Sequence, residues 1–330
     1  MNLNKSMSYI LIHVLNGNDT ASKISAVAEN INIRTIQRAL NRLTELKILK
    51  RIGTNHPKYA INYESLITLN IVDKFLEDEK RPISRFNHNF INWLLKLDNN
   101  GLQLLTNNLI GENISSTHSS SMSARELEYL TIELSWKSSA LEGNTYTLLD
   151  TQLLLLEGIK ANNRTEFETQ MILNHKNAIA FIVENKDLFR NKIKFSTVEE
   201  LHRIIGNNLG ISNGIRKKLV KITASNYEPI SNPHQLREKA EDVLEIINKL
   251  RSPYARSLFA LALIPYLQLF EDGNKRTGRM LANAILISNE NIGFSLRKTD
   301  ARKLALAYLS FYEFNSIKAL SKILLTEINN

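Results

Sequence analysis

The sequence predicts a mainly α-helical protein with a small mixed α and β unit at its N-terminus. Glycine (12) and proline (6) are scarce in the 330 residues, which favours long helices. Apolar residues recur at three- and four-residue spacing in most segments, as at Leu127, Leu130 and Leu134. Alternating, strand-like stretches are few and lie near residues 57 and 217. The dominant helical period therefore sets the fold class.

Composition limits the classes of protein to which the chain can belong. Hydrophobic residues make up 43% and charged residues 23%, as in an ordinary globular protein. The chain has no cysteine, which excludes disulfides, thiol catalysis and cysteine-ligated zinc. No apolar stretch is long enough to cross a bilayer and no signal-like N-terminal segment is visible. We therefore expect a cytoplasmic protein that does not engage a membrane.

Residues 5–64 are predicted to form three helices followed by a hairpin. The third helix lies in NIRTIQRALNRLTELKILK, where apolar residues recur from Ile36 to Leu46 on one face. Three arginines recur every four residues on the opposite face. The segment KRIGTNHPKYAINYE then supplies a glycine-containing loop between two extended pieces.

Basic residues are concentrated in this N-terminal segment. The whole chain has a net charge of +9, and residues 1–64 hold nine Lys or Arg against four Asp or Glu. The order of elements resembles a winged helix-turn-helix, which implies DNA binding through the third helix, with phosphate contacts from the wing. The implied DNA-facing residues are Arg34, Gln37, Arg38 and Arg42 on the helix, with Lys50, Arg51 and Lys58 on the wing. The alternatives are a winged helix that only contacts protein, and a solvated basic surface.

The segment LQLFEDGNKRTGR, residues 267–279, has the features of a phosphate-binding loop. Asp272 is a hard oxygen ligand suited to Mg²⁺. Gly273 and Asn274 tolerate unusual backbone angles, so their N–H groups can converge on an anion at the start of a following helix. Arg276 and Arg279 share one face of that helix and can both bind phosphate oxygens. An ordinary turn would explain Gly273 and Asn274 but not the charged residues around them.

The same segment resembles the signature of the Fic family, H-x-F-x-[DE]-G-N-[GK]-R-x-x-R. The matching residues are Phe270, Asp272, Gly273, Asn274, Lys275, Arg276 and Arg279. Gln268 stands where the family has its catalytic histidine. The resemblance implies a helical Fic-like domain that transfers AMP from ATP to a protein hydroxyl with Mg²⁺. Gly273 to Arg279 would hold the nucleotide phosphates, Asp272 the metal.

Two further segments support the resemblance. SSALEGN, residues 138–144, is similar to the family's inhibitory helix motif, with Ser138, Glu142 and Gly143 in place. The resemblance implies that Glu142 pairs with Arg279 and keeps ATP from a productive pose. GIRKKLVKITASNYEPI, residues 214–230, is similar to the family's flap hairpin, which aligns a target segment by strand-like pairing. The expected flap residues are Val220, Lys221, Ile222 and Thr223. Taken alone, these segments could be a helix end and a surface hairpin.

Gln268 weakens the expectation of activity, because an amide cannot take the proton of an attacking hydroxyl. Loss of a general base costs about 10²–10⁴-fold in rate. Sequence leaves open whether His175, His202 or His234 approaches the site, and for each a packing or surface role is the alternative. Glu271, next in the signature, is a further candidate that could point away.

We therefore expect three parts: a winged helix-turn-helix at residues 1–66, helical connecting material with a polar linker at 67–124, and a Fic-like domain at 125–330. Three functions stay open. The first is a self-inhibited adenylyltransferase, impaired by Gln268, that acts on an unidentified protein or on itself. The second is a non-catalytic, ATP-binding Fic-like pseudoenzyme that acts as a DNA-binding regulator. The third is a remnant that binds neither ligand. A homodimer is implied by the resemblance only.

Overall fold

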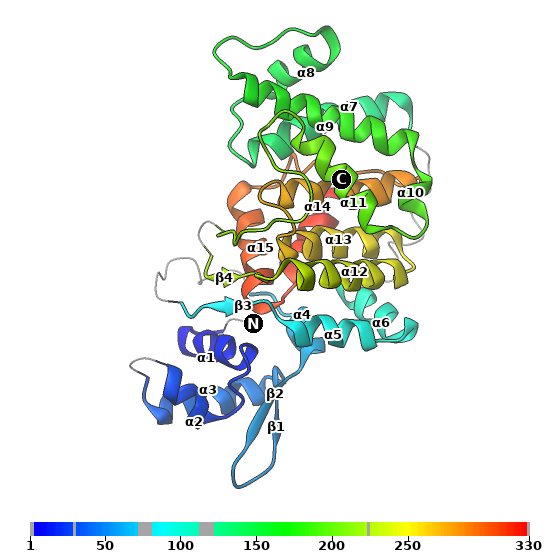
Figure 1. The fold of residues 1–330 in the computed structure, drawn as a ribbon. Coiled ribbons are helices and arrows are strands. Elements are labelled where there is room, and N and C mark those ends of the chain that lie inside the picture. Colours follow the sequence, from blue (N-terminus) through cyan, green and yellow to red (C-terminus); the bar gives the residue numbers. More distant parts are fainter. Residues whose placement is uncertain (1–2, 29–30, 72–80, 112–121, 223–224, 329–330) are drawn as a thin grey trace.

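The computed structural model describes residues 3–28, 31–71, 81–111, 122–222 and 225–328. Figure 1 shows the N-terminal helices and their hairpin at one end, helices α7, α8 and α9 at the other, and helices α12 to α15 between them. The elements are α1 (Lys5–Leu15), α2 (Ala21–Val27), α3 (Ile33–Glu45), β1 (Leu49–Ile52), β2 (Lys58–Ile61), α4 (Tyr63–Ile67), β3 (Ser84–Arg85), α5 (His88–Lys96), α6 (Asn99–Ile110), α7 (Ala124–Ala140), α8 (Leu148–Glu157), α9 (Glu166–Glu184), α10 (Asp187–Arg190), α11 (Phe195–Gly206), β4 (Tyr227–Glu228), α12 (Pro233–Lys249), α13 (Pro253–Leu267), α14 (Asn274–Ser288), α15 (Ala301–Phe314) and α16 (Lys318–Ile328). The protein is mainly helical, as the sequence predicts.

The N-terminal unit contains the three helices and the hairpin predicted for residues 5–64. Strands β1 and β2 pair antiparallel, with Leu49 opposite Ile61 and Ile52 opposite Lys58. Helix α3 buries Ile36, Leu40 and Leu43 against α1, because these residues share one face of the helix. The opposite face of α3 stays open to solvent. This part of the chain supplies most of a hydrophobic core that is separate from the larger one.

Helix α15 joins this N-terminal core to the rest of the molecule. Phe314, at the end of α15, is buried among the residues of the N-terminal core. Helix α4 spans the expected boundary at residue 66: Leu66 packs into the N-terminal core, whereas Ile67 packs into the larger one. The side chain of Asn16 also binds strand β3, donating to the Ile83 carbonyl at 2.6 Å and accepting from the Arg85 N–H at 3.1 Å.

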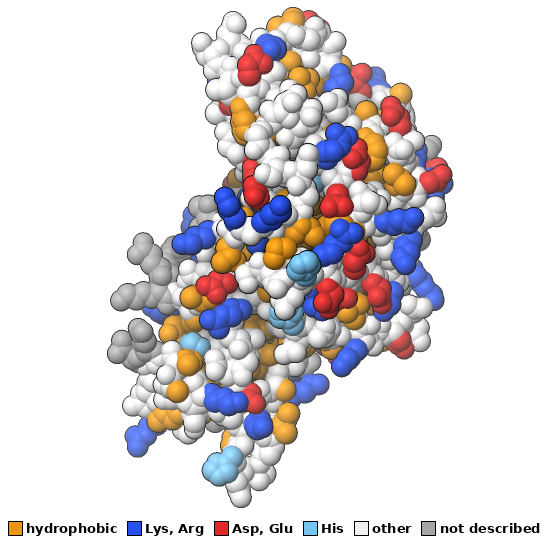
Figure 2. Space-filling model, in the orientation of Figure 1, with side chains coloured by type: hydrophobic (Ala, Val, Ile, Leu, Met, Phe, Trp, Pro, Cys, Tyr) orange, Lys and Arg blue, Asp and Glu red, His pale blue; other side chains and the backbone are white. Residues whose placement is uncertain are grey.

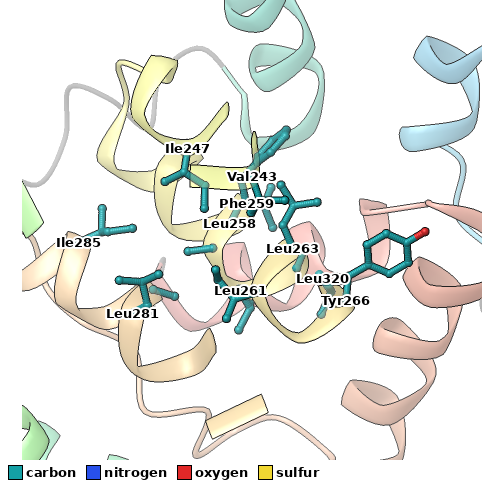
Figure 3. Close-up of a cluster of buried hydrophobic side chains, with 14 of the residues drawn as sticks. Val243, Ile247, Leu258, Phe259, Leu261, Leu263, Tyr266, Leu281, Ile285 and Leu320 are labelled. Carbon is teal, nitrogen blue, oxygen red and sulfur yellow. The ribbon is translucent and has the colours of Figure 1, made fainter. Parts of the chain in front are cut away.

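Helices α13 and α14 form the centre of the larger core. Nearly every residue of both helices is buried, which explains why their sequences are apolar around most of the circumference. Gly278 lets them approach closely, since a Cβ at this position would lie 2.7 Å from the Pro265 ring of α13. Figure 3 shows buried side chains of α12, α13, α14 and α16 meeting here. The labelled residues are Val243 and Ile247 of α12, Leu258, Phe259, Leu261, Leu263 and Tyr266 of α13, Leu281 and Ile285 of α14, and Leu320 of α16.

The described residues of the region expected to connect the two parts form strand β3 and helices α5 and α6. Helices α5 and α6 contribute buried residues such as Phe90, Leu94 and Leu105 to the larger core, so this region packs with the helices that follow it. The polar linker expected in this region is GENISSTHSSSMSA, residues 111–124, and most of it lies outside the described residues. Helix α7 starts directly after it with a reciprocal cap between Ser123 and Glu126.

The structure differs from the hairpin predicted at residues 217–230. Val220, Lys221 and Ile222 are outside any strand, and Thr223 lies outside the described residues. Strand β4 instead pairs in parallel with β3, with Ser84 opposite Tyr227. The alternation of apolar and polar residues at 220–225 is not enough to form a hairpin, because a two-stranded ribbon is only marginally stable unless one face packs on a core.

Candidate functional site

Residues 268–273 form the turn between α13 and α14. Gln268 ends α13 with φ of 49° and Gly273 precedes α14 with φ of 80°, so both are left-handed. Asn274 closes the turn: its side-chain oxygen accepts from the Phe270 N–H at 2.9 Å and its amide donates to the Phe270 carbonyl at 2.8 Å. The start of α14 is thereby fixed. The N–H groups of its first turn have no acceptor inside the helix, which leaves them available to an anion.

His202, on α11, supports the same turn from the neighbouring helix. Its ring stacks on the Phe270 ring, with centroids 3.6 Å apart and planes at 11°. Its Nε2 lies 3.0 Å from the Asp272 carbonyl oxygen, which can only accept, so Nε2 carries the proton. Burial lowers the pKa of His202 below its ordinary value, which favours the neutral ring. His202 therefore positions the loop.

Gln268 is buried, with 8% of its surface exposed. Its side-chain amide donates to the Pro265 carbonyl at 2.7 Å, and its side-chain oxygen accepts from Asn274 at 3.3 Å. Its own carbonyl accepts from the Arg216 Nε at 2.6 Å. The side chain is therefore engaged within the turn, and neither of its polar groups can accept a proton from a substrate hydroxyl.

Arg276, in the first turn of α14, forms an ion pair with Asp272 of the preceding turn. The Arg276 Nη2 lies 2.9 Å from the Asp272 carboxylate, whose side chain is 65% exposed, while the Arg276 side chain is buried. Among the described residues, the buried Nη1 of Arg276 has no hydrogen-bond partner. Buried donors are normally paired, so this atom marks a position suited to an acceptor such as a phosphate oxygen. Within the described ranges, no three His, Asp or Glu side chains gather as a metal site.

Glu142 closes the site from the end of α7. Its carboxylate lies 2.8 Å from the Arg279 Nη2 and 3.2 Å from the Lys275 Nζ. The Arg279 side chain is 1% exposed and the Glu142 side chain 16%. Burial acts to raise the pKa of the Glu142 carboxyl, but Arg279 and Lys275 outweigh it and hold the pKa below its usual range. Glu142 is therefore ionised at neutral pH and occupies the fork of Arg279.

Ser138 makes two more contacts with Arg279. Its hydroxyl oxygen accepts from the Arg279 Nε at 3.0 Å, and its carbonyl accepts from Nη2 at 3.1 Å. The left-handed Gly143, with φ of 92°, turns the chain away after Glu142. Ser138 and Glu142 of the motif SSALEGN thus meet α14 at one arginine.

A cavity of about 120 Å³ adjoins this arginine. It is bounded by the ends of α7 and α14, by α15 and by Ile222 of the segment expected to form the flap. The lining is mixed and combines charged, apolar and aromatic side chains. The lining residues are Leu141, Glu142, Ile222, Lys275, Arg279, Ala301, Leu304, Ala305, Tyr308, Leu309 and Tyr312.

The two ends of the expected flap are held together by Arg216. This buried guanidinium donates to the Lys218 carbonyl at 2.9 Å and to the Ile230 carbonyl at 2.5 Å. The backbone N–H of Arg216 also donates to the Leu269 carbonyl at 2.9 Å. Both ends of the segment from residue 218 to residue 230 therefore lie beside the turn of residues 268–273, which we call the signature turn.

The remaining candidates for a base lie in three different surroundings. His175 is buried between α7 and α9, with Nε2 2.9 Å from the Ser138 hydroxyl. His234 is exposed in the first turn of α12. Glu271 is exposed within the turn of residues 268–273, and its carboxylate accepts from the Ser212 hydroxyl at 3.0 Å. The contacts of His175 and Ser212 had no signal in the sequence, because their partners are remote along the chain.

The residues expected to face DNA lie on the open side of the N-terminal unit. Arg34, Gln37, Arg38 and Arg42 are exposed on α3, and Lys50, Arg51 and Lys58 are exposed on the hairpin. Arg42 also pairs with Glu45 at 2.7 Å, which offsets part of the charge. On the face in Figure 2, basic side chains are spread over this unit and the middle of the molecule, with acidic side chains between them.

Comparison with known proteins identifies relatives of part of the chain. Residues 192–286 match the Fic/DOC family. The protein adenylyltransferase fic-1 of Caenorhabditis elegans is 26% identical over 156 residues, which is 45% of this chain and 30% of the relative. That of Caenorhabditis briggsae is 25% identical over the same shares. The chain thus matches less than a third of the length of these curated relatives.

Two solved structures share the fold. A Fic domain-containing signaling protein from Bacteroides thetaiotaomicron has a TM-score of 0.51 and 20% identity, over 62% of this chain and 86% of the other. A Fic family protein from Desulfovibrio desulfuricans has a TM-score of 0.50 and 18% identity, over 63% and 66%. Within the described residues, each helix is too short or too polar to span a bilayer.

Proposed function

We propose, from the premise that this chain carries a Fic/DOC family domain, that it transfers AMP from ATP to a protein hydroxyl, and that Glu142 inhibits this activity while Gln268 slows it. The observation that carries the proposal is the arrangement around Arg279. One buried guanidinium is held by the ion pair with Glu142 and lies beside a cavity next to the signature turn. A carboxylate in the fork of an arginine occupies the place that a phosphate needs.

The residues present fit ATP and Mg²⁺. The buried Nη1 of Arg276 finds no acceptor among the residues that the structure describes, and a phosphate oxygen would satisfy it. The first turn of α14, after Gly273, offers N–H groups and the positive end of the helix. The exposed carboxylate of Asp272 is a suitable oxygen ligand for Mg²⁺. When bound, Mg²⁺ would neutralise charge on the phosphate oxygens.

In the proposed reaction, the hydroxyl oxygen of the target bonds to the α-phosphorus of ATP. The bond from that phosphorus to the bridging oxygen breaks, and pyrophosphate leaves with the electron pair. The hydroxyl proton must go to solvent or to a phosphate oxygen, because the Gln268 amide donates to Pro265 and cannot accept it. Arg276 and the start of α14 would stabilise the developing charge. The rate is therefore expected to fall about 10²–10⁴-fold below that of a site with a base.

A second candidate function is that of a DNA-binding regulator that binds ATP without catalysis. The observation in its favour is the exposed set of Arg34, Gln37 and Arg38 on α3, together with the buried side chain of Gln268. In this case the N-terminal unit would act as a winged helix-turn-helix that places α3 in a major groove. ATP would then change affinity for DNA without any covalent product.

An experiment with labelled ATP distinguishes the two candidate functions. The Glu142→Gly variant is incubated with Mg²⁺ and ATP labelled at either the α- or the γ-phosphate, alone and with added proteins. Label from the α-phosphate alone on denatured protein supports AMP transfer. Label from the γ-phosphate would instead indicate phosphoryl transfer. No label of either kind, with ATP binding established by titration, would reject transfer and favour the regulator. A Glu142→Gly, Arg276→Ala double variant is the control for adventitious labelling.

A further inference from the structure

A chain of buried hydrogen bonds runs from Arg279 through α7 into α9. The Arg279 Nε donates to the Ser138 hydroxyl oxygen at 3.0 Å. The Ser138 hydroxyl lies 2.9 Å from the His175 Nε2, and the His175 Nδ1 lies 2.8 Å from the Met171 carbonyl oxygen. All the side chains in this chain of bonds are buried. His175 has no part in the proposed chemistry. Its position in this series of hydrogen bonds therefore needs another explanation.

The directions of these hydrogen bonds follow from their last member. The Met171 carbonyl can only accept, so the His175 Nδ1 carries the proton and donates to it. The neutral ring then offers a lone pair at Nε2, and the Ser138 hydroxyl donates its proton there. The lone pairs of the Ser138 oxygen are left to accept from the Arg279 Nε. Burial lowers the pKa of His175 to about 3, which keeps the ring neutral at physiological pH.

We infer that His175 is a positioning residue that orients the Ser138 hydroxyl. The oriented Ser138 hydroxyl then holds Arg279 together with Glu142. The inference rests on the proposed function of the site, in which Arg279 must be released to bind phosphate. Glu142 holds one end of the guanidinium, at Nη2, and Ser138 holds Nε. Loss of Glu142 alone therefore leaves Arg279 held by Ser138, and full release requires that this bond also breaks.

The alternative is that Ser138 is fixed by α7 alone. Its carbonyl would then hold Arg279 regardless of residue 175, since that carbonyl belongs to the helix backbone. The hydroxyl differs, because it can rotate freely unless an acceptor fixes it. The hydrogen bonds of His175 go to Ser138 and Met171 and not to Arg279. Only the orienting role therefore predicts that a change at residue 175 weakens the hydrogen bond of the Arg279 Nε–H.

The test is hydrogen exchange at the Arg279 Nε–H in the full chain, read by NMR with ¹⁵N-labelled arginine and assigned through Arg279→Lys. In His175→Leu we expect exchange about fivefold faster, the effect of losing one hydrogen bond, and in Ser138→Ala an equal increase. The two changes together should add nothing further. His175→Gln, which returns an acceptor, should restore slow exchange. His13→Leu removes a buried histidine from the N-terminal unit and should leave exchange unchanged.

Wild-type exchange in a folded His175→Leu protein would overturn the inference, as would full additivity with Ser138→Ala. If the leucine variant fails to fold, His175→Asn against His175→Gln makes the same comparison, and equal exchange in the two would overturn it. Titration with ATP and Mg²⁺ gives an independent reading, in which His175→Leu binds about fivefold more tightly. Faster exchange without ATP binding by any variant, including Glu142→Gly, would support the role of His175 and reject the proposed function.

Discussion

Glu142→Gly is expected to tighten ATP binding, because it removes the group that competes with phosphate for Arg279. The Glu142 carboxylate makes charge-assisted contacts of 2.8 Å to Arg279 and 3.2 Å to Lys275, and its side chain is largely buried. One such contact stabilises by about 1.5–3 kcal/mol. ATP must break it to reach Arg279, so its removal is expected to lower the Kd for ATP about 10- to 100-fold. Ser138 still holds the arginine, which limits the gain.

Isothermal titration of ATP with Mg²⁺ into both proteins measures this difference. Glu142→Gln is the matched control, because it keeps the shape and one hydrogen bond but loses the charge, and it should give a smaller gain. The thermal midpoint of the unliganded glycine variant should fall, since Arg279 stays buried without its carboxylate. An unchanged Kd in a folded Glu142→Gly protein would refute the competition between Glu142 and phosphate.

Three other substitutions test separate parts of the chain. Gly278→Ala should lower the thermal midpoint, since a Cβ 2.7 Å from the Pro265 ring implies overpacking that costs about 1–3 kcal/mol; an equal midpoint would contradict this close approach. Arg38→Ala should weaken duplex binding and reduce its salt slope by about 1, as read by anisotropy at several salt concentrations, whereas unchanged binding favours a protein-contact role. Hydrogen bonds from Thr145 and neighbouring groups lower the pKa of Glu168 from 4.5 to about 2. The stability this carboxylate adds is present above pH 4.5 and is lost as the pH falls toward 2, so the midpoint difference of Glu168→Gln should shrink over that range, and a constant difference would refute it.

The fold was predictable where the pattern is local. Helix α3 follows from its apolar face, and α14 begins at Asn274, directly after the glycine of the turn. The strands near residue 227 were not predictable. Tyr227 pairs with Ser84, more than a hundred residues earlier, and no local pattern specifies a partner so remote. The same reason explains why the expected flap hairpin is not formed by residues 220–222.

The site shows the same division. The contact between Glu142 and Arg279 was expected from the resemblance, and the structure has it at 2.8 Å. The stacking of His202 on Phe270 and the bond between His175 and Ser138 had no signal in the sequence. Each depends on how helices from different parts of the chain pack together. A histidine in an apolar stretch looks the same whether it packs in the core or orients a neighbour.

The central claim is that the site is a nucleotidyl transfer site that lacks only its base and is closed by Glu142. The most direct measurement is the intact mass of the Glu142→Gly, Gln268→His double variant after incubation with ATP and Mg²⁺, followed over time beside Glu142→Gly. The account predicts that AMP is added covalently to the double variant, about 10²–10⁴-fold faster than to the single variant. An unchanged mass of a folded double variant that binds ATP would contradict the claim and leave the non-catalytic regulator as the better account.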